Sequence, residues 1–185
     1  REEWPEEGKS FKLLSTEIFQ SVNPFFVVFL TPIVVAFFAM LRKSKKEPST
    51  PGKIGWGLFI TALSTLVMVA AVFASQNGLE KSSPAWLIGA YGVITIGELF
   101  LSPMGLSLVS KLSPPRLTSL MMGGWFLATS LGNKLSGVLA SLWNMYEHKS
   151  IFFLVNFSGA MFAALAIFVM LKWLRRVVQE HTGEN

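Results

Sequence analysis

Cysteine is absent from this 185-residue chain, and charge is scarce. Without cysteine there is no disulfide framework, no thiol nucleophile and no cysteine-based zinc cluster. Charged residues make up 15% of the chain and hydrophobic residues 51%, whereas soluble domains usually carry about 25% charged residues. This balance, with a mean hydropathy of +0.50, indicates a membrane protein and excludes a soluble enzyme.

Signatures of several other protein classes are also missing. The chain opens with REEWPEEGKSFK, which lacks the basic region and apolar core of a signal peptide. No P-loop, dinucleotide-binding or Ser-His-Asp pattern is present. The two histidines, His148 and His181, lie far apart outside the apolar runs, so the paired histidines of a membrane haem subunit are absent. The basic residues form no patch suited to nucleic acid.

Five long runs between the charge clusters are apolar or nearly so. They cover residues 19–41, 54–75, 85–110, 117–146 and 151–171. Each run reaches the roughly 20 residues with which a helix crosses a 30 Å hydrocarbon core. Helices satisfy their own backbone in lipid, and no segments of alternating polarity suggest a barrel. The sequence therefore predicts an all-α membrane protein with five transmembrane helices.

Lysine and arginine are unevenly shared between the two sets of loops. The loop 42–53, the turn 111–116 and the tail after residue 171 hold ten, whereas the alternate side holds five. The positive-inside rule places the first set, and with it the C-terminus, in the cytoplasm. Residues 1–17 then form an extracytoplasmic loop. Because a polytopic chain rarely begins outside without a signal, we expect the chain to be part of a longer protein.

Two charged residues lie inside the apolar runs. Glu98 is roughly 20 Å from the inner boundary, counted by helical rise, where a bare charge costs several kcal/mol. An intramembrane acid is a functional hypothesis by default, suited to binding a cation or carrying a proton. A protonated Glu98 satisfied by neighbouring helices is the alternative. Lys134 lies nearer the outer end of its run, and packing or snorkelling explains it at least as well as transport.

Three segments carry a resemblance to a known family. FQSVNPFF, GELFLSPMGLSLVSKLSPPRL and LMMGGWFLATSLGNKLSG follow one another in the chain, and in this order and spacing they resemble the proton-dependent oligopeptide transporter family of the major facilitator superfamily. The resemblance runs from residue 18 to the tail. It implies that the five helices are the eighth to twelfth of a twelve-helix transporter. Residues 18–176 would then form most of the C-terminal six-helix bundle, and 177–185 a cytoplasmic tail.

The family's roles transfer to the positions whose motifs match. By this resemblance, Glu98 would bind the amino terminus of a peptide and would at other times pair with a lysine of the missing N-terminal half. Asn23 would contact the bound peptide, although by sequence alone it could equally be an N-cap. The other implied roles are a cavity-lining serine, a cytoplasmic gate and a side-chain pocket, assigned to Ser102, to Leu106, and to Trp125 with its neighbour Phe126.

Proton coupling is implied by the resemblance alone, because the family's first-helix motif and seventh-helix acid are not among these residues. The expected function is that of a secondary active transporter, a proton-coupled symporter of di- and tripeptides in a bacterial inner membrane. It would need no cofactor beyond protons and no metal. Glu98 would couple peptide binding to a rocking of two bundles about a midplane site.

Two alternatives stay open at this stage. One is a major facilitator carrier for another solute, such as nitrate, an amino acid or another small molecule. A carboxylate at residue 98 suits an anion such as nitrate poorly. The other is a non-transporting membrane subunit, for which composition alone does not exclude a quinone site.

Overall fold

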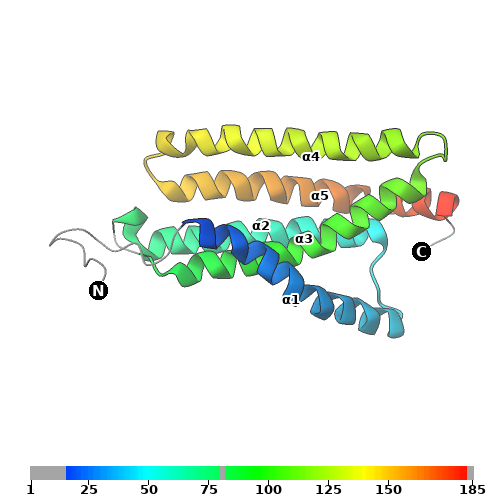
Figure 1. The fold of residues 1–185 in the computed structure, drawn as a ribbon, viewed down its shortest axis with the longest axis horizontal. Helices are drawn as coiled ribbons and strands as arrows, with labels where there is room; N and C mark the ends of the chain where they lie inside the picture. Colours follow the sequence, from blue (N-terminus) through cyan, green and yellow to red (C-terminus); the bar gives the residue numbers. More distant parts are fainter. Residues whose placement is uncertain (1–15, 80–81, 183–185) are drawn as a thin grey trace, which may run out of the picture.

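The computed structural model describes residues 16–79 and 82–182, and five long helices form most of it (Figure 1). These ranges contain no strand, which confirms the predicted all-α fold. The helices are α1 (Thr16–Lys43), α2 (Thr50–Ala74), α3 (Pro84–Leu112), α4 (Thr118–Ser141) and α5 (Lys149–Thr182), with the short 3-10 helices η1 (Gln76–Gly78) and η2 (Leu142–Met145).

Four of the helices are long and apolar enough to cross a membrane, namely α1, α2, α3 and α5. At 24 residues, α4 is also long enough, since it extends about 36 Å. Its glycine, serine and lysine residues make it less apolar, so its membrane crossing stays a prediction. The regular helix ends at Ser141, and the rest of the predicted run 117–146 is mostly the 3-10 turn η2.

The structure describes part of the expected outer loop and of the expected tail. Residues 1–15 of the expected outer loop 1–17 lie outside the described residues, and α1 begins at Thr16. α5 continues well beyond residue 171, so the segment 177–185 is helical as far as Thr182.

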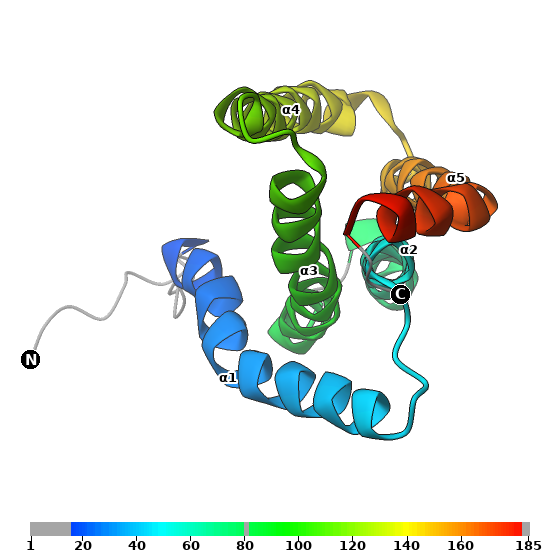
Figure 2. The same cartoon turned by 90° about the vertical axis from the view of Figure 1, so that its right-hand side faces the viewer.

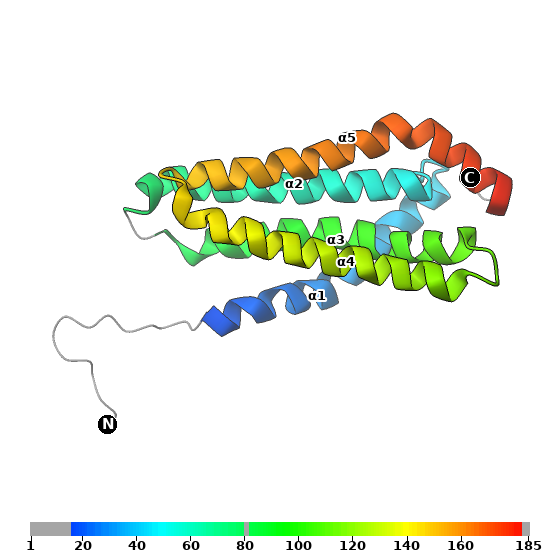
Figure 3. The same cartoon turned by 90° about the horizontal axis from the view of Figure 1, so that it is seen from above.

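Helix α3 lies at the centre of the arrangement and packs against each of the other four long helices. In the end-on view, α2 and α5 lie on one side of α3, whereas α1 and α4 flank its other side (Figure 2). Helices α2 to α5 run side by side, and α1 crosses them obliquely (Figure 3). Within the described ranges α1 does not contact α4, so α3 alone connects these two flanking helices.

Two glycines let α2 and α3 cross at close range. A Cβ atom at Gly57 would lie 2.8 Å from the carbonyl oxygen of Gly97, and one at Gly97 would lie 2.8 Å from the carbonyl oxygen of Gly57. Neither position has room for a side chain. Small residues allow such approaches between membrane helices, where packing and not hydrophobicity drives association. Because Glu98 follows Gly97 directly, this crossing fixes where the carboxylate lies along the bundle.

A small apolar core joins the far half of α1 to α3. It consists of the buried residues Val34, Phe38 and Phe100, and the rings of Phe38 and Phe100 have their centroids 4.7 Å apart. Aromatic pairs at this separation stabilise a contact beyond the area they bury. The core therefore anchors α1 on the same helix that carries Glu98.

Substitution of Gly97 tests the close crossing. Gly97→Ala should lower the midpoint of thermal unfolding of the detergent-purified protein, because the new methyl group would overlap Thr61 and the backbone of Gly57, and overpacking costs about 1–3 kcal/mol. Gly89→Ala, also in α3, is the matched control, since a Cβ there meets nothing within 4 Å. Equal midpoints for the two variants would contradict the crossing.

Candidate functional site

A side-chain hydrogen bond joins α1 to α3 at the acidic position. Nδ2 of Asn23 donates to Oε2 of Glu98 across 3.2 Å. Asn23 lies well inside α1, seven residues after Thr16, so the N-cap alternative is wrong. The structure thus brings together two predicted site residues that are 75 positions apart in the sequence.

Thr95 completes this cluster, and the sequence reasoning missed it. Its side chain is fully buried, and its Oγ1 lies 3.1 Å from Oδ1 of Asn23 and 2.7 Å from the backbone oxygen of Tyr91. Thr95 precedes Glu98 by three residues, a spacing that places both side chains on neighbouring parts of one helix face. That spacing was the available signal, because a hydroxyl near an intramembrane acid is a ready hydrogen-bond partner.

The Glu98 carboxylate is open on one side. Glu98 is exposed, although Thr95 and Gly97 beside it are buried. Oε2 accepts the hydrogen bond from Asn23, and Oε1 has no hydrogen-bond partner among the described residues. A carboxylate oxygen without a partner is an acceptor ready for a cationic donor.

Ser102 and Leu106 continue the stripe of α3 that starts at Glu98. They follow it by one and two helical turns, the spacing at which side chains share a face. Ser102 is exposed and Leu106 is half-buried. α3 runs unbroken past Pro103, so the expected cavity serine and gate residue lie in line with the carboxylate.

Trp125 attaches α4 to this stripe. Its indole ring covers Gly105, where an added Cβ would overlap the ring. Gly105 follows Glu98 by seven residues, which places the ring on the same face about 10 Å further along α3. Trp125 is half-buried, whereas its neighbour Phe126 is 61% exposed. The structure thus places Trp125, and not Phe126, in the contact between α3 and α4.

Lys134 stands apart from the cluster. It lies on α4 and is exposed, and it makes no hydrogen bond or ion pair with any residue that the structure describes. The arrangement therefore favours neither a packing nor a transport role for it.

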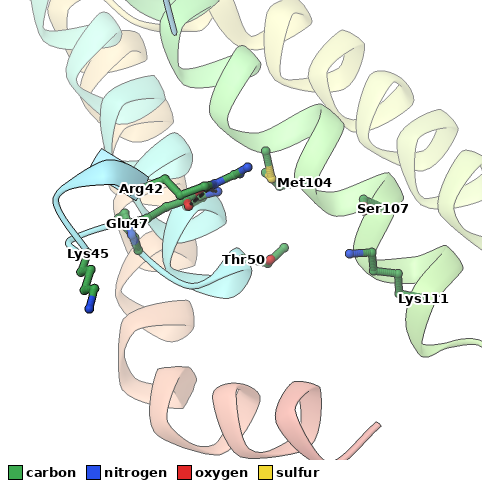
Figure 4. A pocket seen from close by; sticks show the side chains of 9 residues that line it. Arg42, Lys45, Glu47, Thr50, Met104, Ser107 and Lys111 are labelled. Atoms are coloured by element: carbon green, nitrogen blue, oxygen red, sulfur yellow. Dashed lines mark hydrogen bonds and ion pairs between the residues drawn. The ribbon is translucent and has the colours of Figure 1, made fainter. Parts of the chain in front are cut away.

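A pocket of about 570 Å³ lies where α1 ends and α2 begins (Figure 4). Glu47, in the connecting loop, accepts a 2.8 Å hydrogen bond from Nε of Arg42 and pairs with Lys53. Lys53 is buried and also lies over the Phe38 ring, 4.6 Å from its centroid. The carboxylate of Glu47 therefore ties the loop to both helices and to the apolar core.

Comparison with known proteins shows the family. The model of the POT family matches residues 8–154, which is most of the chain, so the chain belongs to the POT family. Together with its apolar helices, this makes it an integral, multi-pass membrane protein. The resemblance noted from the three sequence segments is confirmed.

Curated relatives extend the comparison. The chain is 36% identical to the uncharacterized transporter YclF of Bacillus subtilis over 132 residues, covering 71% of this chain and 26% of that protein. It is 37% identical to the peptide transporter YePEPT of Yersinia enterocolitica over 127 residues, covering 68% and 25%. It is 29% identical to the dipeptide and tripeptide permease A of Escherichia coli over 181 residues, covering 91% and 35%. The chain thus spans about a quarter to a third of these relatives.

Solved structures share the fold. A mutant of the peptide transporter POT in complex with alafosfalin superposes with a TM-score of 0.77 at 30% identity, covering 89% of this chain and 33% of that one. A POT family transporter in complex with 5-aminolevulinic acid gives 0.73 at 29% identity, covering 83% and 30%. The five helices are therefore arranged as in POT transporters of the major facilitator fold.

The ion pairs of Glu47 should contribute less to the stability of the folded protein at acidic pH. The hydrogen bond from Arg42, aided by Lys53, lowers the pKa of Glu47 from 4.5 to about 2. Because this pKa is lower in the folded protein, the ionised Glu47 stabilises the fold fully at pH values above the ordinary pKa of 4.5. The stabilisation decreases as the pH falls from there towards about 2. Glu47→Gln should therefore lower the unfolding midpoint by a constant amount above about pH 5, and the difference from the unsubstituted protein should shrink below that.

The control for this experiment is Glu147→Gln, because the Glu147 side chain is exposed and makes no hydrogen bond or ion pair with a described residue. Thermal unfolding midpoints, measured at a series of pH values for both variants, provide the comparison. A difference between Glu47→Gln and the unsubstituted protein that stayed constant down to pH 3 would contradict the ion pair.

Proposed function

We propose that this chain forms one wall of the substrate cavity of a di- and tripeptide transporter, in which Glu98 binds the amino group of the peptide. The observation that carries the proposal is the hydrogen bond from Nδ2 of Asn23 to Oε2 of Glu98, at 3.2 Å. It leaves Oε1 available to accept a hydrogen bond from the peptide. The names of the relatives YePEPT and permease A support a peptide substrate.

The chemistry of the pair suits an amino group. A peptide amine is a cation with several N–H donors, and its hydrogen bond to a carboxylate is charge-assisted and roughly twice as strong as a neutral one. The low dielectric of the bundle strengthens this attraction. The Asn23 amide fixes the carboxylate in place, so less freedom is lost when the peptide binds.

The rest of the stripe on α3 supplies a wall for variable side chains. Ser102 offers a hydroxyl one turn from Glu98, and Trp125 offers an aromatic face over Gly105. Such adaptable apolar and aromatic surfaces, with few polar groups, are typical of small-molecule sites. Leu106 follows Gly105 directly, one turn beyond Ser102, and acts as the gate that closes the cavity towards the cytoplasm.

The remaining parts of the mechanism belong to the other bundle of the major facilitator fold. It supplies the basic group for the peptide carboxylate and the lysine that pairs with Glu98 when the site is empty. Proton binding drives the cycle, and the two bundles rock about the midplane site in the inner membrane, with the C-terminus of this chain in the cytoplasm.

A carrier for another amine-bearing solute is the second candidate. The POT family structure with bound 5-aminolevulinic acid favours it, since that compound also carries an amino group. Glu98 would bind that group as it would a peptide amine. Competition between such solutes and dialanine for uptake separates the two candidates, because a peptide transporter prefers the peptide.

Uptake by the complete transporter that carries this sequence tests the proposal. In liposomes with an inward proton gradient, Glu98→Gln should reduce the uptake of labelled dialanine by about 10- to 100-fold, the worth of a hydrogen bond to a charged group. Removing the gradient should reduce uptake by the unsubstituted protein. Glu147→Gln, which neutralises an exposed loop carboxylate, should transport normally. Undiminished uptake by Glu98→Gln would overturn the role of Glu98.

A further inference from the structure

The Thr95 hydroxyl faces two acceptors with a single proton. Its Oγ1 lies 3.1 Å from Oδ1 of Asn23 and 2.7 Å from the carbonyl oxygen of Tyr91. A hydroxyl donates one hydrogen bond and accepts up to two, so only one of these contacts can be donated at a time. The other contact needs a donor from the opposite side, and a carbonyl cannot provide one.

The Asn23 amide decides which contact is made. With its NH₂ towards Glu98, as the structure shows, its oxygen faces Thr95 and takes the hydroxyl proton. After a half-turn about its Cβ–Cγ bond, its NH₂ faces Thr95 and its oxygen faces Glu98. The hydroxyl of Thr95 then accepts from the amide and donates to Tyr91, the back-bond that threonine commonly makes in a helix.

One amide orientation fits both protonation states of Glu98, whereas the other fits only the protonated state. An ionised carboxylate only accepts, so it requires the NH₂ of Asn23. A protonated carboxyl carries an O–H, which can donate to the Asn23 oxygen after the half-turn. The proton comes from a hydronium ion in the cavity water, so an O–H bond of hydronium breaks as the carboxyl O–H forms and a water molecule is left.

We propose that the Asn23 amide and the Thr95 hydroxyl form a two-position relay that responds to the protonation of Glu98, which makes Thr95 a positioning residue for this carboxyl. The proposal rests on the proposed role of Glu98 and deepens it. With the ionised carboxylate, Oε1 stays available and charged for a peptide amine. When the carboxyl is protonated, the negative charge that binds the amine is lost. The relay then stabilises the uncharged carboxyl.

The number of hydrogen bonds differs between the two positions. The ionised position contains two, from Asn23 to Glu98 and from Thr95 to Asn23. The protonated position contains three, from Glu98 to Asn23, from Asn23 to Thr95 and from Thr95 to Tyr91. The Thr95 hydroxyl makes one hydrogen bond in the ionised position and two in the protonated position. It therefore favours the protonated position.

Few other ionisable groups act on this cluster. The charged residues of α1, α2 and α5 lie near the ends of those helices. Midway along the bundle, the other ionisable side chains are Tyr91, two turns from Glu98 on its own helix, and Lys134 on α4, which makes no hydrogen bond or ion pair with a described residue. The relay is thus the main polar contact of Glu98 within the part of the chain that the structure describes.

The test compares Thr95→Val, which removes the hydroxyl but keeps the branched shape in a fully buried position, with Thr95→Ser, which keeps the hydroxyl. Infrared difference spectra of the complete transporter in liposomes record the protonated carboxyl, and Glu98→Gln identifies its band. The pH of half-maximal band intensity should fall by roughly 0.5–1 in Thr95→Val, the worth of one neutral hydrogen bond. In Thr95→Ser it should stay close to the unsubstituted value.

A double substitution excludes a purely structural effect of Thr95→Val. In an Asn23→Ala background the amide is gone, so Thr95→Val should no longer move the half-maximal pH. An unchanged pH in the single variant, or an equal shift in both backgrounds, would overturn the relay. The infrared band is measured without peptide, so this experiment tests the relay independently of peptide uptake. The relay can therefore be wrong while the proposed function holds, and the reverse.

Discussion

The arrangement depends on one constraint, the cost of placing a carboxyl group midway along an apolar membrane helix. Glu98 meets that cost through the hydrogen bond from Asn23, which reaches it from a different helix. The bond is possible because Gly57 and Gly97 seat α3 closely on α2, and because the Phe38–Phe100 contact holds α1 on the same helix. Close packing at glycines and between aromatic rings thus accompanies the polar contact of Glu98.

The other four long helices contact α3 in different ways. α2 and α5 pack on one side of α3, while α1 and α4 flank its other side (Figure 2). α1 contacts α3 through the hydrogen bond of Asn23 and through the apolar core, whereas α4 contacts it through an aromatic ring on Gly105. Because α1 and α4 do not touch each other within the described ranges, the stripe of α3 between them stays accessible. Such a surface can face a second bundle.

Much of this could be predicted from the sequence, and the reasons are physical. Apolar runs long enough for a bilayer require helices, and the POT motifs mark Asn23 and Glu98. Which residues touch depends on how helices cross, and a one-dimensional pattern does not contain that angle. Thr95 was missed because its spacing from Glu98 does not indicate a contact with Asn23 until α1 lies against α3. The end of α4 at Ser141 was missed because the apolar pattern continues into the 3-10 turn.

A structure of the complete transporter with a bound dipeptide tests the central claim most directly. The account predicts the amino nitrogen of the peptide about 3 Å from Oε1 of Glu98, with Asn23 still bonded to the other carboxylate oxygen. An amino group bound elsewhere, with Glu98 contacting only protein, would contradict it.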